Sequence, residues 1–157
     1  MFNQFTQSSP GARRTIGLSP LAVLALALLA TPRVVLHDLD ILDEGTALNA
    51  LLVFLPPAVW IAVVLIARVR APLMTLLAVG ATYGVLLALG HQLLWNSAFD
   101  DGPPRLGGNL SDLDPGLQTV ILRVFAVISG VFTGVVVGAI SGAVATALAR
   151  LTGRDRD

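Results

Sequence analysis

The chain of 157 residues contains no cysteine, no lysine and only two histidines. Without cysteine it has no disulfide, no thiolate nucleophile and no cysteine-based metal site. The histidines, His37 and His91, fall on different segments, so we expect neither a metal nor a cofactor. The patterns GxSxG, HExxH, GxGxxG and the Walker loop are also absent. We therefore assign no catalytic residue from the sequence.

Charged residues are scarce, at 13% of the chain, whereas 55% of the residues are hydrophobic. This is the composition of a membrane protein. No carboxylate occurs between Gly45 and Phe99 or between Pro115 and Arg154, which argues against a proton-coupled carrier. Net charge is zero, and we expect no nucleic-acid partner. Arginine in place of lysine, with much alanine, valine, glycine and leucine, is typical of a GC-rich bacterial genome.

Four apolar segments, each close to the roughly 20 residues that cross a bilayer, organise the chain. The sequence predicts an all-α membrane protein, a four-transmembrane-helix bundle with cytoplasmic N and C termini. Polar tails at residues 1–14 and 152–157 flank one transmembrane domain at 15–151. The predicted spans lie at about 16–36, 46–67, 71–95 and 117–149.

The first span begins near Ser19 and Pro20, a pair suited to a helix start, and is interrupted by Pro32 and Arg33. Paired arginines, an apolar core and Ala30 also resemble a signal peptide. The residues around this cleavage point are unfavourable, because Leu28 stands where a small side chain is needed. We expect an uncleaved first helix.

The sorting of charge predicts the orientation. Seven arginines fall on one side of the four spans, whereas two arginines and eight of the ten carboxylates fall on the other. By the positive-inside rule, the arginine-rich side is cytoplasmic. The protein is then a multi-pass protein of the plasma membrane, with the lipid bilayer as its first partner.

Three further segments have a structural interpretation. Pro56 and Pro57 lie in the middle of the second span, where they remove backbone hydrogen bonds and predict a kink. The acidic segment 37–45 does not have the spacing of an EF-hand loop. We interpret it as a solvated loop. Asp114 and Pro115 are suited to the start of the last helix.

Small residues recur every four positions in two spans. A glycine row of this kind lets helix backbones approach closely in lipid. At about 1.5 Å of rise per residue, the two rows match in depth, which predicts packing of the third span against the fourth. A homo-oligomer seam is the alternative. The rows are Gly80, Gly84 and Ala88, and Gly130, Gly134, Gly138 and Gly142.

Polar residues gather near the predicted outer boundary of the hydrocarbon core. His91 is seven residues from Gly84, and Arg123 is seven from Gly130, so both are expected on the seam between the third and fourth spans. Gln92, Trp95 and Asn49 lie at similar depth. We expect the four aspartates of the following loop, at 100, 101, 112 and 114, to balance this charge.

These residues allow two interpretations. Arg123 and His91 can be ordinary interfacial groups, with the arginine reaching the lipid headgroups. Alternatively, with Gln92, Asn49 and Trp95, they form a site for an anionic lipid or solute, because arginine offers a two-pronged hydrogen-bond donor.

The leading functional hypothesis is a non-enzymatic membrane protein. It would be a small accessory subunit, or a binder of an anionic ligand or lipid on the outer side. A small oligomeric transporter or channel is one alternative. A membrane enzyme acting on a lipid headgroup at the outer face is another. A membrane-protein partner or homo-oligomer is left open.

Overall fold

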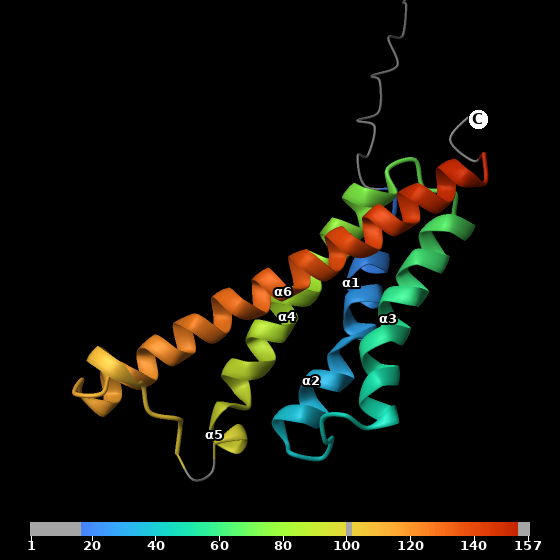
Figure 1. Cartoon of the computed structure of the whole chain (residues 1–157). Coiled ribbons are helices and arrows are strands. Elements are labelled where there is room, and N and C mark those ends of the chain that lie inside the picture. The colour runs from blue at the N-terminus through green and yellow to red at the C-terminus, as the bar shows by residue number, and fades with distance from the viewer. Residues whose placement is uncertain (1–16, 100–101, 154–157) are drawn as a thin grey trace, which may run out of the picture.

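The computed structural model describes residues 17–99 and 102–153. This part of the chain is helical, and its elements are arranged as Figure 1 shows. Four helical segments in it are long and apolar enough to cross a membrane, which indicates a multi-pass membrane protein. The elements are α1 (Pro20–Leu29), α2 (Thr31–Asp38), α3 (Ala47–Ile66), α4 (Pro72–Leu93), α5 (Trp95–Ala98), the 3₁₀ turn η1 (Gly108–Leu110) and α6 (Pro115–Leu151).

The first span is built from two helices. Ser19 caps α1, its side chain accepting a hydrogen bond from the Ala22 N–H, and Pro20 follows at the start of the helix, as predicted. The break falls at Ala30, with Pro32 in the first turn of α2. Proline has no N–H to continue the helical ladder. Trp60 of α3 donates from Nε1 to the Leu26 carbonyl at 2.8 Å, next to the break.

The interpretation of segment 37–45 as a solvated loop is wrong at its start. α2 continues to Asp38, which is only 6% exposed, and the turn follows that residue. The next helix begins at Thr46, whose hydroxyl accepts from the Asn49 N–H and donates to the Asp43 carbonyl. α3 then runs without interruption through Pro56 and Pro57.

A Schellman turn ends α3. The Val69 N–H bonds the Val64 carbonyl and the Arg68 N–H bonds the Leu65 carbonyl. Arg68 has φ +48°, a left-handed conformation that glycine usually supplies at this position. The two hydrophobic ends of the motif, Val64 and Val69, are both buried.

α4 and α6 form the most extensive helix contact in the described chain. A Cβ atom built on Gly138 would lie 2.5 Å from the Leu76 carbonyl oxygen and 2.9 Å from Gly80 Cα. One built on Gly130 would lie 3.3 Å from Ala88 Cα. Gly134 lies against the backbone of Gly80 and Gly84 still more closely. The two helix backbones therefore touch, with no room for side chains between them.

The core of the bundle lies where α1, α2, α3 and α4 meet. Trp60 is fully buried there, and its ring meets that of Tyr83 edge to face, with centroids 6.0 Å apart. α6 lies mainly against α4 and reaches α3 in addition. α4 and α6 separate towards the end that carries α5 (Figure 1). At 37 residues, α6 is longer than a bilayer core of about 30 Å requires. Asp114 caps it, as predicted, by accepting from two backbone N–H groups.

Candidate functional site

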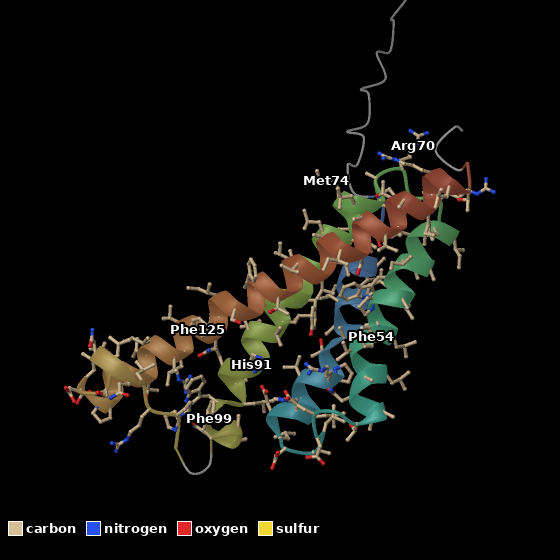
Figure 2. All side chains as sticks on the ribbon, in the orientation of Figure 1. Phe54, Arg70, Met74, His91, Phe99 and Phe125 are labelled. Carbon is tan, nitrogen blue, oxygen red and sulfur yellow. The ribbon has the colours of Figure 1, made fainter. Side chains whose placement is uncertain are left out.

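A cavity of about 910 Å³ lies at the end of the molecule where α4 and α6 separate. In Figure 2, the labelled side chains of His91, Phe99 and Phe125 mark this end. We call it the His91 cleft. Four helices contribute to it: the C-terminal end of α2, the last turns of α4, the short helix α5 and one face of α6. The lining residues include His37, Asp38, Leu39, Asp40, Leu87, His91, Trp95, Ser97, Phe99, Phe125, Ala126, Ser129, Gly130 and Thr133.

One short hydrogen bond joins the two helices α2 and α4 on one wall of the cleft. Nδ1 of His91, on α4, lies 2.7 Å from Oδ2 of Asp38, at the end of α2. The Asp38 side chain is only 5% exposed, whereas that of His91 is 34% exposed. A buried carboxylate needs a hydrogen-bond donor, so Nδ1 carries the proton in this pair. This contact fixes the orientation of the imidazole ring.

The second nitrogen of His91 is available to a ligand. Among the described residues, Nε2 has no hydrogen-bond partner. Because Nδ1 donates to Asp38, Nε2 of the neutral ring is an acceptor, and that of the protonated ring is a donor. Ser129 and Thr133 of α6 line the same cleft. The cleft therefore offers an oriented imidazole and two hydroxyl groups.

His37 extends the polar wall towards the turn after α2. Its Nδ1 lies 3.6 Å from Oδ1 of Asp38, and its Nε2 lies 3.2 Å from Oε1 of Glu44. The His37 side chain is 40% exposed, and these contacts are longer than that of His91. Together with Asp40, this wall is rich in carboxylates. The described residues nevertheless contain no group of three ligands that could hold a metal ion.

Arg123 is engaged beside the cleft and does not line it. Its guanidinium donates to Oε1 of Gln92 at 3.2 Å, and the Gln92 amide donates back to the Arg123 carbonyl at 3.2 Å. The guanidinium carbon lies 4.7 Å from the centroid of the Trp95 ring. Trp95 in turn packs against Phe99, with ring centroids 4.9 Å apart. Trp95 therefore separates the arginine charge from the cleft.

The structure distributes the sequence-predicted ligand-binding residues over three places. His91 and Trp95 line the cleft, and Gln92 and Arg123 pair beside it. Asn49 accepts a hydrogen bond from Arg33 Nε at 3.0 Å and lines neither this cleft nor the second large pocket.

Among the described residues, the carboxylate that meets His91 is not one of the four predicted loop aspartates. The partner of His91 is Asp38, the last residue of α2. In the loop before α6, Asp114 serves as the helix cap and Asp112 lies near the Ser111 hydroxyl. Asp100 and Asp101 lie outside the described residues. Arg123 has no carboxylate partner in the part of the chain that the structure describes.

Sequence reasoning missed Asp38, Ser129 and Thr133 as cleft residues. A signal was present for each. Asp38 ends the first span on the same side of the bundle as His91 ends the third, because successive spans alternate in direction. Ser129 and Thr133 each precede a glycine of the α6 row, so they lie about 100° around the helix from it.

Comparison of the chain with protein-family models, with curated proteins and with solved structures gives no significant match. Function is therefore inferred from the geometry of the site.

Proposed function

We propose that the protein is a non-enzymatic, multi-pass protein of the plasma membrane that binds a lipid in the His91 cleft. In this proposal both termini are cytoplasmic and the cleft opens on the outer side. The sorting of arginine along the sequence supports that orientation. The observation that carries the proposal is the mixed lining of the cleft: charged and imidazole groups gather at the ends of α2 and α4, whereas α6 contributes Phe125 and Ala126 beside the hydroxyls of Ser129 and Thr133.

The two walls suit the two ends of an amphipathic molecule. The α2 and α4 wall presents the exposed carboxylate of Asp40 and the Nε2 nitrogen of His91, and the buried carboxylate of Asp38 lies against His91. The α6 wall presents Phe125 and Ala126, and Phe125 is 67% exposed. A lipid headgroup would occupy the polar side, while its chains follow the apolar face of α6. Clefts with mostly apolar walls and a few oriented polar groups are typical of ligand sites.

The charge of the cleft lining narrows the choice of lipid headgroup. The carboxylates of the cleft favour a headgroup with an ammonium group or hydrogen-bond donors over a purely anionic one. The sequence-based hypothesis of an anionic ligand depended on Arg123, whose guanidinium is held by Gln92 and Trp95 outside the cleft. Phosphatidylethanolamine, which carries an ammonium group, is therefore the probe of choice.

Native mass spectrometry of the full-length protein in a neutral detergent tests this proposal. Phosphatidylethanolamine, phosphatidylcholine and phosphatidylglycerol are added at equal concentration, and bound lipids are counted. Ala126→Leu would narrow the cleft from the α6 side while leaving His91 and Asp38 themselves unchanged. Ala143→Leu is the matched control, because Ala143 is an exposed alanine of the same helix that lines neither large pocket.

We expect the protein to retain phosphatidylethanolamine over phosphatidylcholine, and Ala126→Leu to reduce that retention while Ala143→Leu does not. Equal retention of phosphatidylethanolamine by the two variants would contradict binding in the His91 cleft. Thermal unfolding of both variants checks that the fold is retained.

A second candidate function, an enzyme acting on a lipid headgroup, is favoured by one specific observation. Asp38 orients His91, and Nε2 has no hydrogen-bond partner among the described residues. A carboxylate prepares an imidazole to act as a general base in this way. Ser129 in the same cleft, or a water molecule, would be the group that it deprotonates.

Headgroup release from phosphatidylethanolamine in proteoliposomes distinguishes the two candidates. Release that is lost on His91→Gln and on Ser129→Ala, with unfolding temperatures unchanged, supports the enzyme. Retention of the lipid without release supports the binder.

The alternative of an oligomeric transporter or channel receives less support. It required the glycine rows as a seam between copies of the chain. In the structure these rows lie against one another within one chain, at Gly80, Gly84, Gly134 and Gly138. That arrangement leaves them no exposed face for a second copy.

A further inference from the structure

A second cavity, of about 810 Å³, lies at the opposite end of the bundle, between the α3–α4 turn and the C-terminal end of α6. Arg70 and Met74 mark this end in Figure 2. We call it the arginine pocket. The residues that line it are Val64, Leu65, Arg68, Val69, Arg70, Ala71, Pro72, Leu73, Met74, Thr146, Ala149, Arg150, Thr152 and Gly153.

The described residues that line this pocket include three arginines and no carboxylate. Arg68 and Arg70 come from the α3–α4 turn, and Arg150 comes from the last turn of α6. The side chains of Arg68 and Arg70 form no ion pair within the described residues. The guanidinium groups of Arg68 and Arg70 beside one cavity favour a phosphate, which arginine binds through paired hydrogen bonds.

The first turn of α4 adds to this positive character. Its cap residue, Ala71, has no side-chain hydrogen bond, and Pro72 has no N–H. Leu73 and Met74, whose backbone N–H groups open the helix, both line the pocket. Helix N-termini carry a partial positive charge that attracts anions.

The apolar part of the lining indicates a lipid as the source of the phosphate. Val64, Leu65, Leu73 and Met74 line the pocket next to the arginines, and Met74 is 55% exposed. The pocket lies where α3 ends at Ile66 and α4 begins, which is the boundary of two candidate membrane spans. A phosphate at this depth belongs to a headgroup whose acyl chains lie along the helices.

We infer that the arginine pocket binds the phosphate headgroup of an anionic phospholipid. The backbone at Arg68 supports a role for its side chain, because the residue occupies a left-handed position where glycine is favoured. This property also separates binding from folding. Arg68→Gly removes the guanidinium while relieving the unfavourable φ of +48°.

The experiment counts bound lipid by native mass spectrometry on the full-length protein in neutral detergent, with phosphatidylglycerol, phosphatidylcholine and inorganic phosphate as separate probes. We expect selective retention of phosphatidylglycerol. Arg68→Gly should weaken this retention about fivefold, and Arg70→Gln should do the same, in line with the contribution of one arginine at a membrane surface. Arg68→Gly should leave the unfolding temperature unchanged or raised.

Arg105→Gln is the matched control, since Arg105 is an exposed arginine that lines neither large pocket, and its retention should equal that of the wild type. Equal retention of phosphatidylglycerol and phosphatidylcholine would overturn the inference, as would unchanged retention in Arg68→Gly. Binding of inorganic phosphate without selectivity for phosphatidylglycerol would also overturn it, because the pocket would then be a site for a free anion. Ala126→Leu, in the other cleft, should not change phosphatidylglycerol retention, so the two proposals fail independently.

Discussion

Nδ1 of His91 lies 2.7 Å from Oδ2 of Asp38, although 53 positions separate the two residues in the chain. The contact ties the end of α2 to the last turns of α4 and forms one wall of the His91 cleft. α2 is a short helix of eight residues that follows the break in the first span. The pair therefore connects two helices and is also the polar group that a ligand in the cleft would contact.

His91→Ala should lower the free energy of unfolding by about 1–3 kcal/mol, because Asp38 would remain buried without its close donor. Urea or thermal unfolding in detergent measures the change. His37→Ala is the control and should cost less, since the His37 side chain is 40% exposed and its contact to Asp38 is 3.6 Å long. In a double-mutant cycle, His91→Ala and Asp38→Asn should be coupled. Additive effects would show that the pair does not stabilise the bundle.

Gly134→Ala should destabilise the protein by about 1–3 kcal/mol, because the added methyl group would meet backbone atoms of Gly80 and Gly84 that cannot move independently. Gly107→Ala is the matched control. Gly107 has an ordinary φ of −98°, and a Cβ built there meets nothing within 4 Å. Thermal unfolding midpoints of the two variants compare them directly. If both substitutions were tolerated alike, the close approach of α4 and α6 would not contribute to stability.

Trp60→Phe should cost about 1–3 kcal/mol, since it keeps an aromatic ring but removes the donor to the Leu26 carbonyl. Leu26 lies in the last turn of α1, where the Ala30 N–H bonds later carbonyls instead. Trp95→Phe serves for comparison, because the Trp95 indole N–H donates no hydrogen bond among the described residues. Unfolding in detergent should rank Trp60→Phe as the more damaging change. The opposite ranking would mean that the break in the first span needs no support from α3.

Arg123→Lys should lower stability by about 0.5–1 kcal/mol even though it preserves the charge, because the planar guanidinium both stacks on Trp95 and donates to Gln92. Arg105→Lys is the control, since the exposed Arg105 makes neither kind of contact with the residues that the structure describes. The unfolding midpoint and the emission of Trp95, measured in a Trp60→Phe background, report the change. If Arg123→Lys had the unfolding midpoint and Trp95 emission of the wild type, Arg123 would contribute only its charge at the membrane interface.

The partners of some site residues could not be predicted from the sequence, because adjacent residues of a helix point in different directions. His91 and Gln92 are neighbours, yet they lie about 100° apart on α4. A seven-residue spacing placed His91 on the side of Arg123, but the residue that meets Arg123 is Gln92, while His91 faces α2. A small error in the predicted direction of a side chain therefore assigns it the wrong contact partner.

The sequence alone determined the helical class and the four apolar segments, because helix formation in an apolar chain depends on local composition, on prolines and on capping residues such as Ser19 and Asp114. The tertiary structure decided which polar groups meet. Burial of Asp38 against His91, the stacking of Arg123 on Trp95 and the gathering of arginines at one pocket all join residues from different helices. Such contacts depend on how the helices cross and where they separate, which no local pattern of residues contains.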